Sequence, residues 1–303
     1  MRKTFINTLC SLAEKNNRIW LLSGDLGFSI LEQFEQKFPD RYINIGVAEQ
    51  NMAGIATGIA LSGNTVFIYS IANFPIFRCL EQIRNDICYH NADVKIVSVG
   101  GGMAYGSAGY SHHGIEDIGV MRLMPNMTVV SPADPVETKL AMTAIARHPG
   151  PCYLRLGKSS EPVLHQKQPD FDLSKAIIFR EGSDITLAAT GSVLKMAIEA
   201  AEELKVQGKW AEVISVPVLK PFDAETILKS VHKTGRIITI EEHSVGGLSA
   251  VVAESITGIK CRFFPLLLKQ PPITVAANQK QLMEMHGLSA DSLLRAAKEM
   301  LSE

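Results

Sequence analysis

YINIGVAEQNMAGIATG, residues 42–58, is the segment of this chain that says most about its architecture. A short apolar strand pattern runs through a glycine into a helix pattern rich in glycine and alanine, and one carboxylate, Glu49, stands at the junction. Small side chains let another backbone approach closely, so we expect this helix to pack against something large, such as a second subunit. Two roles are open for Glu49: it satisfies free N–H groups at the helix start, or it is a functional carboxylate.

Strand and helix patterns repeat on both sides of this segment. Up to about residue 160 they alternate, with helices expected at 29–38 and 78–89 among others, and strands at 18–22, 42–45, 65–69, 94–99, 127–130 and 152–155. Residues 161–175 are polar, contain two prolines and show no periodicity, which is typical of a linker. A smaller unit follows over 176–303, with strands expected at 185–189, 211–216, 236–241 and 261–264.

This alternation of short apolar strands with helices predicts an α/β fold in which a mainly parallel sheet is covered by helices. The chain has 303 residues, of which 46% are hydrophobic. A single core rarely grows beyond about 250 to 300 residues. We therefore expect two domains of this kind, residues 1–160 and residues 176–303, joined by the linker.

Charge and composition exclude several classes of partner. The formal net charge is -1 with Lys and Arg scattered, so we expect no nucleic-acid partner. The five cysteines are widely spaced without a C-x-x-C pair, which predicts neither a disulfide framework nor a zinc site and indicates reduced thiols in a cytoplasmic protein. No apolar run approaches ~18 residues, so we expect no membrane insertion and no secretion.

In a parallel sheet, ligands bind outside the carboxyl ends of the strands, and four loops at such ends are unusual here. The loop 23–29 offers Asp25, glycine turns and Ser29 at an expected helix start, a place suited to anions, although a plain capped turn explains it equally well. Phe74 and Phe77 follow the strand 65–69 and could stack on a flat heterocycle. Core packing is the alternative for this aromatic pair.

The other two loops carry basic groups. Residues 100–116 are too glycine-rich for regular structure and contain two adjacent imidazoles, His112 and His113, which are candidates for acid, base or hydrogen-bond donor. Arg155, near the end of the strand 152–155, could hold a phosphate bidentately or pair with a neighbouring acid.

Other catalytic signatures are missing from the sequence. It contains no G-x-S-x-G, no G-x-x-x-x-G-K-[ST] and no H-E-x-x-H motif, which removes the main support for a hydrolase, a P-loop enzyme or a zincin. The remaining histidines away from these loops, such as His165, are expected at the surface or the edge of the core. The segment EEHSVGG, residues 241–247, is expected to form a turn or to line a subunit contact.

Taken together and in order, these segments resemble the C-terminal half of transketolase over nearly the whole chain. The matching stretches are SGDL (23–26), GVAEQNM (46–52), EQIR (81–84), YSHHGIED (110–117), MPNMTVVSPADP (124–135) and EEHSVGGL (241–248). The resemblance implies a domain that binds the pyrimidine of thiamine diphosphate, followed by the small transketolase C-terminal domain. The implied activity is transfer of a two-carbon ketol unit from a ketose, expected to be phosphorylated, to an aldose.

The same resemblance implies roles for particular residues. Glu49 matches the glutamate that hydrogen-bonds the pyrimidine ring of the cofactor and promotes its imino tautomer. Phe74 matches the ring-stacking aromatic, with Phe77 nearby, although Ile71 stands where relatives often have another phenylalanine. His112 matches the active-site histidine that stabilises oxygen charge during ketose cleavage.

Further positions match substrate contacts, and two depart from the family pattern. Ser29 and Arg155 fall where relatives hold the sugar phosphate, and Asp25 falls near the cofactor. Ala108 replaces a usual acid four residues before the histidine, and Gly100 replaces a phosphate-binding histidine. Losing such a buried partner costs on the order of 1 to 3 kcal/mol, so we expect a non-standard donor or acceptor sugar.

The resemblance supplies only the pyrimidine side of the cofactor site. In the family, the diphosphate and its Mg²⁺ are held by a separate domain with a Gly-Asp-Gly motif and an asparagine, and Gly24-Asp25-Leu26 is not that motif. We therefore expect no metal ligand in this chain, and an N-terminal transketolase subunit as partner in a self-associating α2β2 assembly. The alternatives are the β subunit of a 2-oxo acid dehydrogenase, an enzyme like deoxyxylulose-phosphate synthase, or a non-catalytic assembly subunit.

Overall fold

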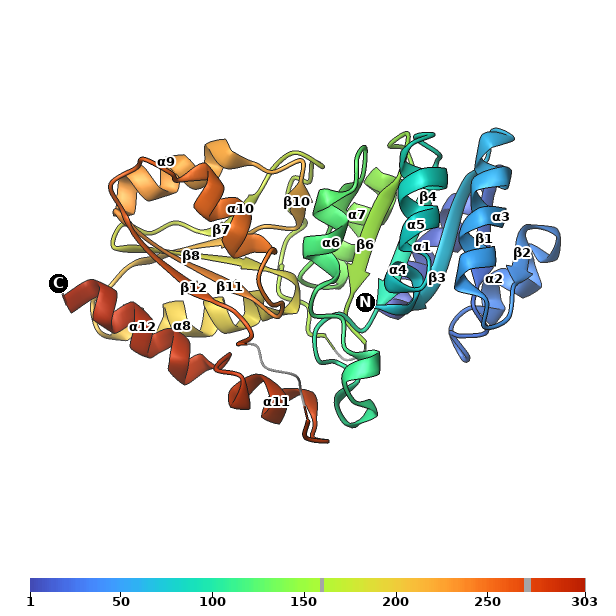
Figure 1. Cartoon of the computed structure of the whole chain (residues 1–303). Coiled ribbons are helices and arrows are strands. Elements are labelled where there is room, and N and C mark those ends of the chain that lie inside the picture. Colours follow the sequence, from blue (N-terminus) through green and yellow to red (C-terminus); the bar gives the residue numbers. More distant parts are fainter. Residues whose placement is uncertain (159–160, 270–273, 303) are drawn as a thin grey trace.

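The computed structural model describes residues 1–158, 161–269 and 274–302. Two sheets stand side by side, each between layers of helices, with the N-terminus beside the first sheet and the C-terminus at the far side of the second (Figure 1). The expected fold class, two domains that each hold a mainly parallel sheet covered by helices, is confirmed. The expected domain boundary at residue 160 lies outside the described residues.

The first sheet has seven strands in the order β10-β5-β6-β4-β3-β1-β2. Six are parallel: β1 (Ile19–Ser23), β2 (Tyr42–Asn44), β3 (Thr65–Ile71), β4 (Val94–Val99), β5 (Thr128–Val130) and β6 (Cys152–Leu156). The last strand, β10 (Val218–Lys220), runs antiparallel to β5 although it belongs to the sequence of the second unit. The second unit thus contributes directly to the first sheet.

Helices cover both faces of this sheet. One face carries α3 (Glu49–Leu61), α4 (Phe74–Phe77), α5 (Leu80–Gln82), a π-helical turn (Ile83–Cys88) and α6 (Asp117–Leu123). The other carries α1 (Arg2–Ala13), α2 (Glu32–Lys37) and α7 (Pro135–Ile145), and a 3-10 turn (Pro39–Arg41) precedes β2.

The second sheet has the order β12-β11-β8-β9-β7. Its strands are β7 (Ile177–Arg180), β8 (Ile185–Thr190), β9 (Ala211–Ser215), β11 (Arg236–Glu241) and β12 (Arg262–Leu266), and only β7 among these is antiparallel to its neighbour. Its helices are α8 (Leu194–Val206), α9 (Ala224–Thr234), α10 (Leu248–Ser255), α11 (Gln279–Met285) and α12 (Ala290–Ser302). One hydrophobic cluster continues from α3 and α6 of the first domain to α10 of the second.

Several elements differ from expectation. The helix expected from Ser29 begins at Glu32, because Ser29 itself adopts a left-handed conformation with φ 62° that a helix does not allow. The helix expected over 78–89 is divided between α5 and the π-helical turn. The strands β7 and β10 and the helices α6 and α11 were not expected.

The helix α3 follows the pattern that the sequence indicated. Its buried side holds Met52 and small residues such as Ala53 and Ala56, whereas a Cβ atom placed at Gly54 or Gly58 would meet no atom within 4 Å. The side of α3 that carries Gly54 and Gly58 is therefore open in this chain. Within the described ranges, no helix is long and apolar enough to cross a bilayer.

Candidate active site

Glu49 is the first residue of α3, and its side chain is only 2% exposed. Its two oxygens accept hydrogen bonds from Nη1 of Arg78, each at 2.9 Å. Arg78 lies just after α4, and its own side chain is 46% exposed. The start of α3 has no side-chain cap. Glu49 is therefore a buried carboxylate that is neutralised by one arginine at the surface, and not a helix cap.

Phe74 and His112 lie beside this pair. The guanidinium of Arg78 covers the Phe74 ring at 4.2 Å from its centroid, and the His112 ring meets Phe74 edge-on at 5.1 Å between centroids. The tip of the 100–116 loop is fastened here, because Nδ2 of Asn73 donates to the Ser111 carbonyl at 2.6 Å. Three distant segments thus bring a carboxylate, an aromatic face and an imidazole together.

Gly24 lies close to Glu49 and Ser70. A Cβ atom at Gly24 would lie 3.9 Å from Oγ of Ser70 and 4.0 Å from Oε1 of Glu49. The Ser70 hydroxyl is buried and has no hydrogen-bond partner in the structure. Buried polar groups are nearly always paired. An unpaired hydroxyl next to a glycine and a carboxylate is the pattern expected where a polar ligand completes the site.

Three other predicted site residues, Phe77, Asp25 and Ser29, lie near the group formed by Glu49, Phe74 and His112 but make no described contact with it. Phe77 is 46% exposed and lines a cavity of about 300 Å³ together with Tyr110 and Glu116. Asp25 is exposed and accepts from Asn44 at 3.0 Å. Ser29 lines a different hollow, on the side of α1 and α2.

Arg155 is held inside the chain. It is 6% exposed, its Nε donates to Asp117 at 2.7 Å, and its Nη2 donates to the carbonyls of Gly114 at 2.8 Å and Glu242 at 2.9 Å. Burial has the largest single effect and would lower the pKa of Arg155, but the charges of Asp117, Tyr153 and Glu242 together with the Asp117 hydrogen bond outweigh it, so the net pKa is raised. Of the two roles that the sequence left open, these contacts show the ion pair. Phosphate binding by Arg155 stays a prediction without support from this geometry.

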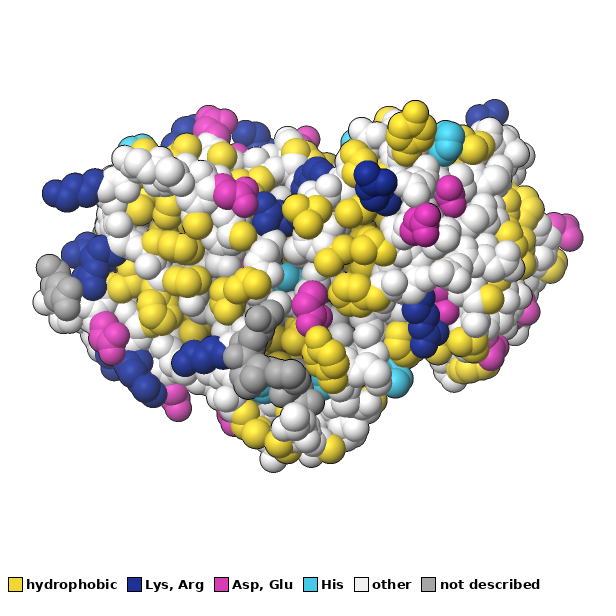
Figure 2. Space-filling view, viewed as in Figure 1, with side chains coloured by type: hydrophobic (Ala, Val, Ile, Leu, Met, Phe, Trp, Pro, Cys, Tyr) yellow, Lys and Arg dark blue, Asp and Glu magenta, His cyan; other side chains and the backbone are white. Residues whose placement is uncertain are grey.

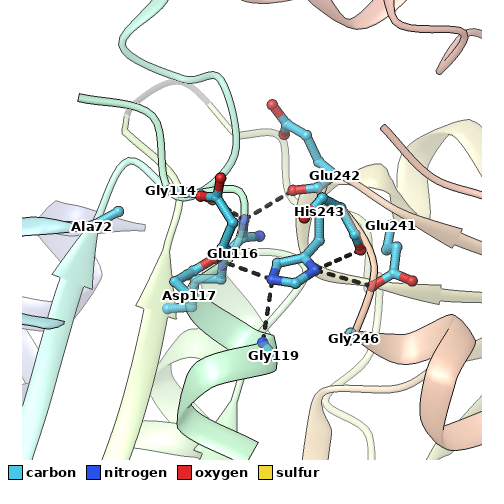
Figure 3. Close-up of polar contacts among 12 residues, drawn as sticks. Ala72, Gly114, Glu116, Asp117, Gly119, Glu241, Glu242, His243 and Gly246 are labelled. Carbon is cyan, nitrogen blue, oxygen red and sulfur yellow. Dashed lines mark hydrogen bonds and ion pairs between the residues drawn. The ribbon is translucent and has the colours of Figure 1, made fainter. Parts of the chain in front are cut away.

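The segment 241–247 joins the two domains. Nε2 of His243 accepts from the amide of Gly119 in the first turn of α6 at 3.3 Å, while its Nδ1 contacts the Ser244 carbonyl at 2.8 Å (Figure 3). Glu241 accepts from the amides of Leu248 and Ser249 and so caps α10. The expected turn is therefore also a domain contact.

The sequence did not single out Arg78, Ser70 or Glu242. Arg78 stands four residues after Phe74, so one helical turn would have placed the two side chains together, and this spacing was an available signal. Ser70 and Glu242 are buried by residues distant in the sequence, so no local sequence pattern indicates their contacts. The described residues contain no group of three or more His, Cys, Asp or Glu side chains that could hold a metal ion.

Comparisons with known proteins agree with this architecture. Residues 1–162 match the family described as the transketolase pyrimidine-binding domain, and residues 174–293 match the transketolase C-terminal domain. The chain belongs to the transketolase family. Its extent is that of the C-terminal, or β, subunit of a transketolase whose two halves are separate chains, as the following relatives show.

One relative is the 6-deoxy-6-sulfo-D-fructose transketolase subunit of a Clostridium species, 37% identical, covering 99% of this chain and 94% of the relative. Another is an apulose-4-phosphate transketolase subunit of Phocaeicola vulgatus, 34% identical, covering 100% and 97%. A solved structure described as a split-gene transketolase, inactive β4 tetramer, superimposes with a TM-score of 0.89 at 34% identity, covering 99% and 97%.

Proposed function

We propose that this chain is the β subunit of a thiamine-diphosphate-dependent transketolase and transfers a two-carbon ketol unit from a ketose to an aldose when joined to an N-terminal subunit. The observation that carries the proposal is the buried carboxylate of Glu49 beside Phe74 and His112. The family as a whole depends on thiamine diphosphate, and the relatives described above are transketolase subunits.

The residues present fit the pyrimidine end of the cofactor. Glu49 offers a carboxylate to a ring nitrogen, Phe74 offers an aromatic face, and the unpaired Ser70 hydroxyl lies, like Glu49, close to Gly24. When bound, thiamine diphosphate supplies a nucleophilic carbon that takes up and passes on the two-carbon unit. Glu49 would hold or release the proton at the ring nitrogen, and His112 would stabilise negative charge on the substrate oxygen.

The diphosphate and Mg²⁺ are assigned to a partner. Three large apolar side chains around the site are exposed: Phe28 and Val47 in loops, 73% and 72% accessible, and Phe77 at the end of α4, 46% accessible. Figure 2 shows hydrophobic side chains at the surface of both domains on one face. Such surfaces are suited to burial by another chain. We propose an N-terminal subunit on the site face and a second copy of this chain on the open side of α3, giving an α2β2 assembly.

The substrate is proposed to differ from the usual sugar phosphates. Ala108 is exposed at the end of a 3-10 turn, Gly106–Ala108. A Cβ atom at Gly100 would lie 2.2 Å from the Tyr105 ring, so Tyr105 fills the space that a histidine at position 100 would need. The Tyr105 ring in turn lies beside the His112 ring, with 5.9 Å between the ring centroids. Contacts at this end of the substrate would therefore come from different groups.

A reconstitution assay tests the proposal. The chain is mixed with an N-terminal transketolase subunit, thiamine diphosphate and Mg²⁺, and supplied with ketose donors and aldehyde acceptors. We expect the donor to shorten by two carbons without release of carbon dioxide. Activity on 2-oxo acids with carbon dioxide release would instead favour a dehydrogenase or a synthase.

We place the complex in the cytoplasm, because all five cysteines are free thiols and four of them are buried.

A further inference from the structure

Residues 100–116, here named the histidine loop, are closed at their base by two backbone hydrogen bonds. The amide of Gly102 donates to the carbonyl of Gly114 at 2.7 Å, and the amide of Gly114 donates to the carbonyl of Gly102 at 2.9 Å. His112 lies near the tip, where Asn73 holds the loop to α4. The position of His112 therefore depends on how firmly the base is fixed.

Glu242 of the second domain reaches into this base. The residue directly follows β11, is 4% exposed, and accepts from the amide of Met103 at 2.8 Å. Nε2 of Gln279 donates to both of its carboxylate oxygens at 3.0 Å. A Cβ atom at Gly102 would lie 2.3 Å from the carboxyl carbon of Glu242, so only glycine lets the loop backbone pack this closely.

The backbone of Glu242 holds the other end of the same base. Nη2 of Arg155 donates both to the carbonyl of Glu242 at 2.9 Å and to the carbonyl of Gly114 at 2.8 Å. Asp117, directly after the loop, fixes this arginine through Nε. Glu242 thus contacts the start of the histidine loop, at Met103, through its side chain. Its backbone carbonyl is linked to the end of the loop, at Gly114, through Arg155.

We propose that Glu242 is a positioning residue for ketol transfer, through which the second domain holds the histidine loop so that His112 faces Phe74. The inference rests on the proposed function for its catalytic part, but the fixing of the loop is measurable without turnover. Burial raises the pKa of the Glu242 carboxyl, and the hydrogen bonds from Gln279 and Met103 oppose that rise. The net pKa stays raised, and a carboxyl oxygen accepts from the Met103 amide in either protonation state.

The neighbouring residue offers a matched control. Glu241 is also buried, and it accepts from two backbone amides, those of Leu248 and Ser249, which both lie in α10 of its own domain. Replacing Glu241 removes a comparable number of hydrogen bonds without removing one from the histidine loop. If both buried glutamates only stabilised the fold, replacing Glu241 and replacing Glu242 would affect the histidine loop equally.

The test compares Glu242→Ala and Glu242→Gln with Glu241→Gln. Hydrogen exchange is first measured on the full chain. Leaving the Met103 amide unpaired should speed exchange in residues 100–116 by roughly tenfold or more for Glu242→Ala. The glutamine, whose carbonyl can still accept, should restore part of the protection. Glu241→Gln should lower the thermal midpoint without changing exchange in the loop.

Turnover is then measured in the complex with the N-terminal subunit. For Glu242→Ala we expect kcat to fall by about tenfold, with little change in KM or in the Kd for thiamine diphosphate. Unchanged loop exchange in both Glu242 variants, or equal effects of Glu241→Gln on the loop, would overturn the inference. If loop exchange changes while the wild-type complex shows no ketol transfer, the proposed function fails and the fixing of the loop stands.

Discussion

Nη1 of Arg78 lies 2.9 Å from both carboxylate oxygens of Glu49, while its guanidinium covers the face of the Phe74 ring. A carboxylate this deeply buried is costly without a counter-charge. In the chain alone, Arg78 is the side chain that supplies it. Because Arg78 is half exposed, the buried carboxylate of Glu49 is paired with a charged group that reaches solvent.

Replacing Arg78 should destabilise the isolated chain. Arg78→Ala leaves the carboxylate of Glu49 without its partner, and we expect a loss of roughly 1 to 3 kcal/mol, limited by the exposure of the arginine. Urea unfolding of the two chains measures this loss in the free energy of unfolding. The matched control is Arg84→Ala, since Arg84 is exposed and its side chain, among the hydrogen bonds described, contacts only the side chain of Asn85. Equal stability of the two variants would contradict the role given to Arg78.

Removing the charge of Glu49 should separate folding from catalysis. Glu49→Gln keeps the shape of the side chain and no longer buries a charge, so we expect stability to change by less than about 1 kcal/mol. In the reconstituted complex kcat should fall by roughly 10²- to 10⁴-fold, because proton transfer at the ring nitrogen is lost. Steady-state kinetics with saturating cofactor check this. Full activity would favour the non-catalytic assembly subunit.

His112 should affect the chemical step more than cofactor binding. His112→Asn removes the imidazole that contacts Phe74, and we expect kcat to fall by about 10²- to 10³-fold. The Kd for thiamine diphosphate should stay within a few-fold of wild type. His90→Asn serves as the control, because His90 is exposed and its ring contact is with Tyr89. A loss of cofactor binding with unchanged kcat would place His112 in a different role.

The linker provides a pH-dependent contact. His165 is buried, and Nε2 lies 2.8 Å from Oε1 of Glu137 in the first turn of α7. Burial lowers the pKa of His165, but the hydrogen bond and charge of Glu137 outweigh burial, so the net pKa is raised. A raised pKa means that the protonated form is favoured by folding.

The stabilisation from His165 should therefore be fully present below about pH 6.5, the unfolded value, and should be lost as pH rises through the folded pKa. The difference in unfolding free energy between wild type and His165→Gln isolates this residue from the other histidines. We expect that difference to shrink as pH rises above about 6.5. A difference that grows with pH would contradict the assignment.

Local pattern predicted most of both sheets, because apolar strands and amphipathic helices carry their periods in sequence. It missed β10, whose three residues are too few to show a period and which pairs with a strand of the other domain. It missed α6, which follows the glycine-rich loop directly.

The candidate site divides in the same way. Glu49, Phe74 and His112 were found because motifs around them match a family. Arg78 and Glu242 were missed because their contacts are set by tertiary packing: Glu242 meets Met103 across 139 positions of sequence. Arg155 was placed at a strand end correctly, but its partner Asp117 lies 38 positions away, so the sequence left its role open.

We propose that this chain holds one side of a thiamine diphosphate site that a second chain completes. The most direct measurement is a calorimetric titration of thiamine diphosphate with Mg²⁺ into this chain alone and into its mixture with an N-terminal transketolase subunit. We predict binding only in the mixture, and its loss when Glu49 is replaced by alanine. Tight, Mg²⁺-dependent binding to this chain alone would contradict the claim.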